Sequence, residues 1–133
     1  MNIRKTRLYD ASIEDVWQAI TDEKKLAEWF MPARFKAEPG YQFEFQDQPR
    51  GKWDGRLWGE VNEVIEPHRL CYSWIGNQMN NKTLVEWTLE KTHQGTKVTL
   101  EHSGFKGFND GLIGFFHRFG WRKYFTGLDK FLL

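Results

Sequence analysis

The sequence predicts an α+β domain in which a curved antiparallel sheet lies against one long C-terminal helix. Between residues 41 and 102 apolar and polar residues alternate, and after Gly104 the apolar residues recur at helical spacing. The first pattern is typical of strands with one buried face, and the second is typical of an amphipathic helix. A chain of 133 residues is long enough for one such domain and short for two, so we expect a single domain over residues 1–133.

The N-terminal part predicts an edge strand followed by two short helices. Residues 3–9 alternate as a strand does, and Ser12 then begins a helix as its cap, with Asp15 placed to complete a capping box. A second short helix is expected over residues 22–30. It should end there because Pro32 disfavours helical geometry in the residue before it.

The alternating region predicts several strands joined by short turns. The runs with a period of two are residues 41–46, 70–75, 85–90 and 97–102, and the turn residues between runs are Asp54-Gly55, Glu66-Pro67-His68, Gly76-Asn77 and His93-Gln94-Gly95. Connections this short favour a meander of hairpins. The helix that follows carries one inward stripe, made of His117, Trp121, Tyr124, Leu128 and Phe131.

Aromatic residues make up 17% of the chain, with 7 Trp and 11 Phe, and they predict an apolar cavity between sheet and helix. The helix contains Gly111, Gly114, Gly120 and Gly127, each costing about 1 kcal/mol relative to alanine, so close approach, a kink or cavity space is expected there. The expected ligand-binding residues are Phe45, Tyr72, Trp74, Trp87, His102, Phe116, His117 and Trp121. For the sheet aromatics among them, ordinary core packing is the alternative.

His102, by strand parity, and His117, by its place on the stripe, are both expected to face this cavity. Either could serve as a general base. The alternative is that each is a hydrogen-bonded interior histidine, because no carboxylate stands at a recognisable spacing from either of them. Glu63 would add a third polar group if it faced the same side. Two histidines are too few for a metal site, and no motif of a hydrolase, metalloprotease or nucleotide-binding site occurs. We therefore expect no catalytic residue, no metal and no cofactor.

Charge, cysteine content and hydropathy exclude several partners and compartments. The 19 Lys and Arg residues nearly balance 18 Asp and Glu residues, so we expect no nucleic-acid partner. No apolar stretch is long enough for a membrane span, and residues 1–10 do not resemble a signal peptide. Cys71 is the only cysteine and is expected to be a buried thiol. These features predict a cytoplasmic protein without a membrane partner.

Residues that match a known family run through nearly the whole chain. They are Ala11-Ser12, Glu14, Val16-Trp17, Ala19-Ile20-Thr21, Leu26, Trp29-Phe30, Gly55, Gly59, Val61, Glu63-Val64, Pro67, Arg69-Leu70, Ser73-Trp74, Gly95-Thr96, Val98, Leu100, His102, Gly104-Phe105, Gly120-Trp121 and Leu128. On these residues the chain resembles the START-like, or SRPBCC, superfamily. Within it, the chain is similar to the bacterial single-domain homologues of the activator of the ninety-kilodalton heat-shock protein ATPase. The resemblance implies a helix-grip fold like that of the birch pollen allergen.

The resemblance also implies a function. Related proteins bind lipids, polyketides or flavonoids, so we expect a carrier or sensor of a small hydrophobic or aromatic ligand, oriented by His102, Tyr72 or Trp74. Because other branches of the superfamily include cyclases and hydrolases, one alternative is a cyclase, dehydratase or hydrolase that uses the cavity histidines. A second alternative is a protein-interaction module with a chaperone partner.

Two further expectations concern the long helix. Phe115 and Phe119 fall on the side opposite the inward stripe, beside arginines, and so predict a homodimer contact or a mobile lid. Residues 104–120 combine glycines with phenylalanines, and a glycine-rich backbone opens at low cost. We expect this segment to move when a ligand enters.

Overall fold

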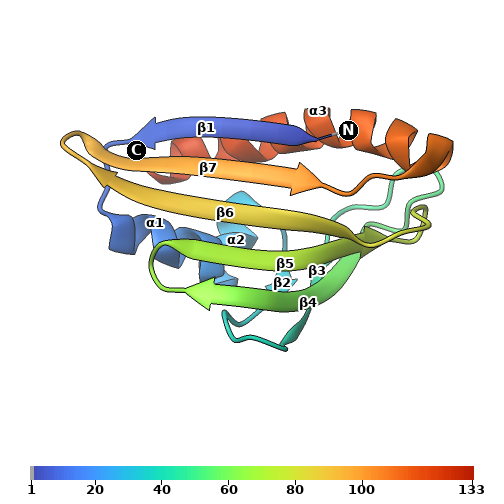
Figure 1. Cartoon of the computed structure of the whole chain (residues 1–133), viewed down its shortest axis with the longest axis horizontal. Helices are drawn as coiled ribbons and strands as arrows, with labels where there is room; N and C mark the ends of the chain where they lie inside the picture. The colour runs from blue at the N-terminus through green and yellow to red at the C-terminus, as the bar shows by residue number, and fades with distance from the viewer. Residues whose placement is uncertain (1) are drawn as a thin grey trace.

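The computed structural model describes residues 2–133, and Met1, the first residue of the expected domain, lies outside the described residues. Within residues 2–133 the chain forms a seven-stranded antiparallel sheet with the strand order β1-β7-β6-β5-β4-β3-β2. The elements in chain order are β1 Ile3–Tyr9, α1 Ile13–Thr21, α2 Glu23–Trp29, β2 Ala33–Arg34, β3 Gln42–Gln46, β4 Arg56–Ile65, β5 Arg69–Gly76, β6 Thr83–Thr92, β7 Gly95–Ser103 and α3 Gly107–Phe131. Figure 1 shows all three helices behind the sheet, which confirms the predicted α+β fold.

The N-terminal elements form largely as their local sequence predicts. β1 is an edge strand, as predicted, and pairs with β7. The backbone N–H of Asp15 donates to Oγ of Ser12 at 3.1 Å, so Ser12 caps α1. Asp22 caps α2 in the same way, accepting from the N–H of Lys25 at 3.1 Å. The helix predicted over residues 22–30 therefore begins at Glu23, with Asp22 as its N-cap and not its first helical residue.

A β-bulge in β4 decides which polar residues reach the interior. Val61 pairs with Tyr72, but Glu63 pairs with Cys71, so the register shifts by one residue between them. Glu63 consequently lies exposed on the outer face, where Arg69 donates a hydrogen bond to it. It is not the third polar group of a cavity.

Cys71 lies on the same outer face and is nonetheless buried. Its neighbours there are Glu63, which accepts from its Sγ at 3.7 Å, and Arg69, which also pairs with Glu86 at 2.7 Å. Burial raises the pKa of the Cys71 thiol to about 11, so it remains protonated near neutral pH. The buried thiol predicted from the sequence is confirmed.

The inward face of α3 differs from the predicted stripe. Trp121 and Leu128 are buried as expected, whereas His117, Tyr124 and Phe131 are only half-buried. Phe125 is completely buried and was not predicted. On a helix, residues three and four positions after Trp121 both lie on the same side as Trp121 and Leu128. These residues are Tyr124 and Phe125, and the sheet covers Phe125 more fully.

The glycines of α3 show where the helix lies close to the rest of the protein. At Gly127 an added Cβ would lie 2.6 Å from the carbonyl oxygen of Trp29, and at Gly114 it would lie 2.8 Å from the ring of Phe105. At Gly111 and Gly120 it would meet nothing within 4 Å. The helix is therefore packed closely against Trp29 at Gly127 and against Phe105 at Gly114, whereas Gly111 and Gly120 face open space.

Candidate ligand-binding cavity

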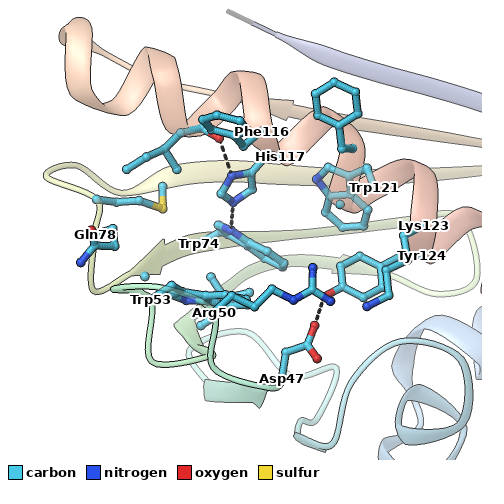
Figure 2. Close-up of a pocket in the computed structure, with 16 residues that line it drawn as sticks. Asp47, Arg50, Trp53, Trp74, Gln78, Phe116, His117, Trp121, Lys123 and Tyr124 are labelled. Carbon is cyan, nitrogen blue, oxygen red and sulfur yellow. Dashed lines mark hydrogen bonds between the residues drawn. The ribbon is translucent and has the colours of Figure 1, made fainter.

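A cavity of about 430 Å³ lies between the sheet and residues 113–124 of α3 (Figure 2). Its walls come from α3, from β4 and β5, from the β5–β6 loop, and from residues 47–55 between β3 and β4, which we call the mouth loop. The lining residues are Asp47, Arg50, Trp53, Leu57, Trp74, Gly76, Gln78, Met79, Ile113, Phe116, His117, Phe119, Gly120, Trp121, Lys123 and Tyr124. The volume and the largely aromatic wall suit a small apolar molecule.

The predicted site residues divide between this cavity and the closed core. Trp74, Phe116, His117 and Trp121 line the cavity. Phe45, Tyr72, Trp87 and His102 do not line it, and each is at most 3% exposed. They occupy positions on the concave face, as strand parity predicted, but other side chains cover them.

Residues 29–35 fill the part of the concave face where Phe45 and Trp87 lie. The ring centroid of Trp29 lies 6.4 Å from that of Trp87, and the centroid of Phe30 lies 5.0 Å from that of Phe45. The ring of Phe35 stacks on Phe45 with centroids 5.9 Å apart. Residues 29–35 therefore close one end of the groove between sheet and helix, and the cavity remains at the other end.

The mouth loop was not predicted to contribute to the site. It supplies Asp47, Arg50 and Trp53 to the wall. Its composition is that of a polar turn, and its one useful signal was a tryptophan among polar residues, glycines and one proline. Sequence reasoning also missed Lys123 on α3.

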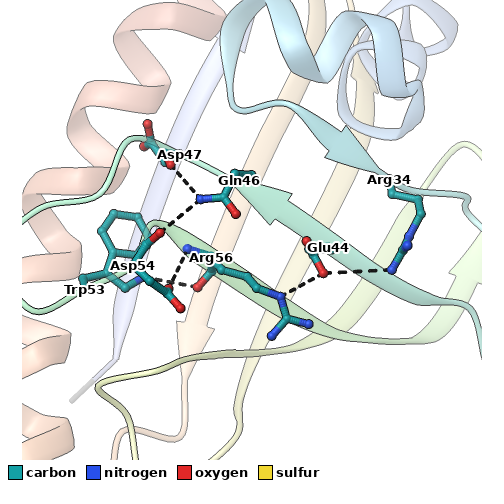
Figure 3. A network of polar contacts seen from close by, with 7 residues as sticks. All are labelled: Arg34, Glu44, Gln46, Asp47, Trp53, Asp54 and Arg56. Atoms are coloured by element: carbon teal, nitrogen blue, oxygen red, sulfur yellow. Dashed lines mark hydrogen bonds and ion pairs between the residues drawn. The ribbon is translucent and has the colours of Figure 1, made fainter.

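Polar contacts fix the mouth loop at its base (Figure 3). The side-chain amide of Gln46 donates to the carbonyl oxygens of Asp47 and Asp54, at 2.9 and 3.1 Å. The backbone N–H of Arg56 donates to Asp54 at 2.9 Å, and its guanidinium pairs with Glu44 at 2.8 Å. These contacts hold the loop against β3 and β4, and so position Trp53 at the cavity wall.

The β5–β6 loop is held to α3 by a buried carboxylate. Asp110 is fully buried and accepts from the backbone N–H groups of Asn80 and Asn81, at 2.9 and 2.8 Å, and from the side chain of Asn109 at 3.0 Å. Burial alone would raise the pKa of this carboxyl, but these hydrogen bonds outweigh it and hold the pKa below its ordinary value. The contact positions Gln78 and Met79 at the rim.

Each indole N–H on the wall is already bonded within the protein. Trp74 donates to Nε2 of His117 at 3.0 Å, and Trp121 donates to Nδ1 of His102 at 2.9 Å. Trp53 donates to the carbonyl oxygen of Arg56 at 3.2 Å. Because an indole has one donor, these tryptophans offer a ligand only their ring surfaces.

The two histidines are neutral and have both ring nitrogens engaged. Nε2 of His117 accepts from Trp74, so Nδ1 carries the hydrogen and donates to the carbonyl oxygen of Ile113 at 2.9 Å. In His102, Nδ1 accepts from Trp121, and Nε2 donates to Oγ1 of Thr83 at 2.7 Å. Burial lowers the pKa of both histidines, and the nearby His117 lowers that of His102 further. Their ring centroids are 5.3 Å apart, but only His117 reaches the cavity.

Charged residues gather at one end of the cavity, around Tyr124 (Figure 2). The hydroxyl of Tyr124 donates to Oδ2 of Asp47 at 2.5 Å, and burial followed by this bond raises the tyrosine pKa. Nζ of Lys123 lies 5.7 Å from the Tyr124 ring centroid, and the charge of Arg50 also acts on the hydroxyl. We call Asp47, Arg50, Lys123 and Tyr124 the mouth cluster.

Residues 2–133 contain neither a candidate metal cluster nor a candidate membrane-spanning helix. No three histidine, cysteine, aspartate or glutamate side chains in this range lie close enough together to hold a metal ion. Nor does any helix in the described part of the chain combine the length and apolar character needed to cross a membrane.

Comparison with known proteins identifies the family. The family model described as Activator of Hsp90 ATPase homolog 1-like protein matches residues 10–132. No protein with a curated description matches. Protein MLL2253 from Mesorhizobium loti is a similar solved structure, with 26% identity, a TM-score of 0.86, and coverage of 99% of this chain and 96% of that one.

Two other solved structures are similar at the same identity. Protein BH1534 from Bacillus halodurans is 26% identical with a TM-score of 0.81, and the match covers 100% of this chain and 97% of that one. CalU16 from Micromonospora echinospora is 26% identical with a TM-score of 0.74, and the match covers 98% of this chain and 74% of that one. With a family match over residues 10–132 and a shared START-like fold, the chain belongs to the family of Activator of Hsp90 ATPase homolog 1-like proteins.

Proposed function

We propose that the protein binds a small hydrophobic or aromatic ligand, lipid-, polyketide- or flavonoid-like in character, and acts as its carrier or sensor. The observation that carries this proposal is the cavity of about 430 Å³ with Trp53, Trp74 and Trp121 in its wall. Because their N–H groups are bonded within the protein, the wall offers mainly ring surface. Apolar burial then provides the affinity, at roughly 25 cal/mol per Å² before the costs of association.

The state of the histidines supports binding over catalysis. A general base needs a free lone pair within reach of the proton it removes. In His117 that lone pair accepts from Trp74, and His102 does not reach the cavity. A cyclase, dehydratase or hydrolase activity would first have to break the Trp74–His117 bond, so we keep these activities as the weaker alternative.

The homodimer, chaperone and lid hypotheses all concern the exposed rings of α3, and all three stay predictions. Phe115 and Phe119 are 43% and 50% exposed, and their ring centroids are 5.5 Å apart. This surface is accessible to a second copy of the chain or to a chaperone. Phe119 also lines the cavity rim, so a lid role is equally consistent with its position.

Tryptophan fluorescence tests the proposal, because three tryptophans line the cavity. We expect a saturable change with at least one member of a flavonoid and fatty-acid panel. Gly120→Leu should abolish that change, since a side chain at this cavity-lining glycine enters open space. Gly111→Leu is the matched control, because it makes the same change on the same helix outside the cavity. A flat titration for every compound, or an unchanged response in Gly120→Leu, would contradict the proposal.

A further inference from the structure

The polar groups of the cavity are unevenly distributed. The aromatic wall of the cavity offers a ligand no indole donor, since Trp53, Trp74 and Trp121 all donate to protein acceptors. His117 is likewise bonded at both ring nitrogens. A polar ligand group placed at this wall would lose its hydrogen bonds to water without replacing them. The polar end of a ligand therefore belongs at the mouth cluster.

The mouth cluster has an excess of positive charge. Arg50 and Lys123 are both exposed lining residues, and neither takes part in an ion pair within residues 2–133. Asp47 is the one acidic side chain in the lining. Its Oδ2 accepts from Tyr124 at 2.5 Å and its Oδ1 accepts from the backbone N–H of Gln48 at 2.7 Å. One carboxylate, already engaged on both oxygens, faces two cations.

From this arrangement we propose that the ligand is an amphipathic anion. Its apolar body enters first and lies against the ring surfaces of Trp74 and Trp121. Its single carboxylate, or an equivalent acidic group, stays at the opening between Arg50 and Lys123. This inference rests on the proposed binding function and specifies the chemical class of the ligand.

A pair of probes with the same ring system separates charge from apolar fit. 2-Naphthoate carries a carboxylate, and 2-naphthamide replaces it with a neutral amide. We expect the wild-type protein to bind 2-naphthoate about tenfold more tightly at low ionic strength, the effect of two partly solvated charge pairs. Raising the salt concentration should reduce this preference, because exposed charges are screened.

The double variant Arg50→Gln, Lys123→Gln identifies the groups responsible. It should lose the preference for 2-naphthoate while keeping its affinity for 2-naphthamide. Arg118→Gln, Arg122→Gln is the matched control, because it removes two exposed arginines from the same molecule without altering a lining residue. The control should keep the preference. Far-ultraviolet circular dichroism and the unfolding midpoint establish that both variants fold.

The other outcomes are distinct from one another. Equal affinity for the two probes in the wild type, abolished by Gly120→Leu, would overturn the anion inference and leave the binding function standing. A preference that persists in the Arg50 and Lys123 variant, or that disappears equally in the control, would also overturn it. Binding of neither probe, together with no response to the flavonoid and fatty-acid panel, would overturn both.

Discussion

Trp74 donates its indole N–H to Nε2 of His117 at 3.0 Å, and this bond joins β5 to α3 along the cavity wall (Figure 2). A second bond of the same kind, from Trp121 to His102 at 2.9 Å, joins α3 to β7 beneath it. In both bonds the imidazole nitrogen acts as the acceptor. Protonation would place a hydrogen on that nitrogen and turn each pair into two opposed donors, so both bonds require neutral histidines.

The first prediction is that stability falls as the pH drops below 6.5. Above the ordinary histidine pKa of 6.5, His102 and His117 are neutral in the folded and unfolded states, and their contribution is fully present. Below it, the unfolded chain takes up protons at both residues while the folded chain, with its lowered pKa values, does not. The free energy of unfolding therefore decreases until the folded pKa values are reached. Urea unfolding at pH 7.5, 6.5 and 5.5 measures the decrease.

His117→Gln provides the control for this pH dependence. A glutamine amide oxygen can accept from Trp74 in place of Nε2, but it does not titrate in this range. We expect the variant to show a shallower dependence between pH 7.5 and 5.5, with His102 responsible for part of the remainder. Equal unfolding midpoints for the wild type at pH 7.5 and 5.5 would contradict the assignment.

The second prediction concerns the glycines of α3. Gly127→Ala should lower the free energy of unfolding by about 1 to 3 kcal/mol, because its Cβ would lie 2.6 Å from the carbonyl oxygen of Trp29 and force α2 and α3 apart. Gly120→Ala should raise it by about 1 kcal/mol, because the new methyl group meets nothing within 4 Å and alanine favours helix. Thermal and urea unfolding measure both changes.

Gly111→Ala is the matched comparison, since it also meets open space but does not line the cavity. It should resemble Gly120→Ala in stability and the wild type in ligand binding. Stabilisation by Gly127→Ala would mean that α2 and α3 separate at little cost, contrary to the close approach described above.

The third prediction concerns the bond between Tyr124 and Asp47, which ties α3 to the mouth loop. Tyr124→Phe removes the hydroxyl and should lower the free energy of unfolding by about 1 kcal/mol, typical for a partly solvated hydrogen bond. The mouth loop should then separate from α3 more often, and a bound probe should dissociate faster in stopped-flow fluorescence. Tyr41→Phe, at a half-buried tyrosine outside the cavity, is the control. Identical dissociation rates in the wild type and Tyr124→Phe would show that this bond does not limit release.

The sequence was informative where one segment determines its own structure. The capping role of Ser12 depends on a contact three residues away, and the inward orientation of Trp74 depends on strand parity, so both followed from local patterns. The family resemblance added the arrangement of sheet and helix. These features account for most of the fold.

Other features depend on contacts between distant segments, and local patterns did not predict them. The bulge between Val61 and Glu63 reverses the parity of one residue, and the adjacent apolar pair Val64-Ile65 left the parity of Glu63 open in the sequence. Phe30 and Phe35, which lie on either side of β2 in the chain, cover Phe45, and this is why strand parity alone assigned too many residues to the cavity. Trp53 reaches the wall because polar contacts fold the mouth loop back.

The fourth prediction concerns residues 104–120, which we expect to move when a ligand enters. The first half of α3 exposes most of its large apolar side chains, and Phe108 and Phe116 are 90% and 59% exposed. In the second half, by contrast, Trp121, Phe125 and Leu128 are buried. Segments with few buried contacts open at a lower free energy. Amides in residues 104–114 should therefore exchange with solvent faster than those in residues 121–132, and a bound ligand should slow them.

Asp110 allows this motion to be tested independently of any ligand. Its carboxylate accepts the backbone N–H groups of Asn80 and Asn81, so movement of the first half of α3 must release these bonds. Asp110→Asn weakens the contact, and it should speed exchange at Asn80, Asn81 and residues 104–114 while leaving residues 121–132 unchanged. Hydrogen exchange read by mass spectrometry resolves these segments. Uniform protection along α3 in the free protein, unaltered by Asp110→Asn, would show that this part of the helix is rigid. The mouth loop would then be the route of entry. Its release requires breaking the contacts of Gln46, Asp54 and Tyr124, together with the bonds that Asn77 and Gln78 donate to the carbonyl oxygen of Lys52.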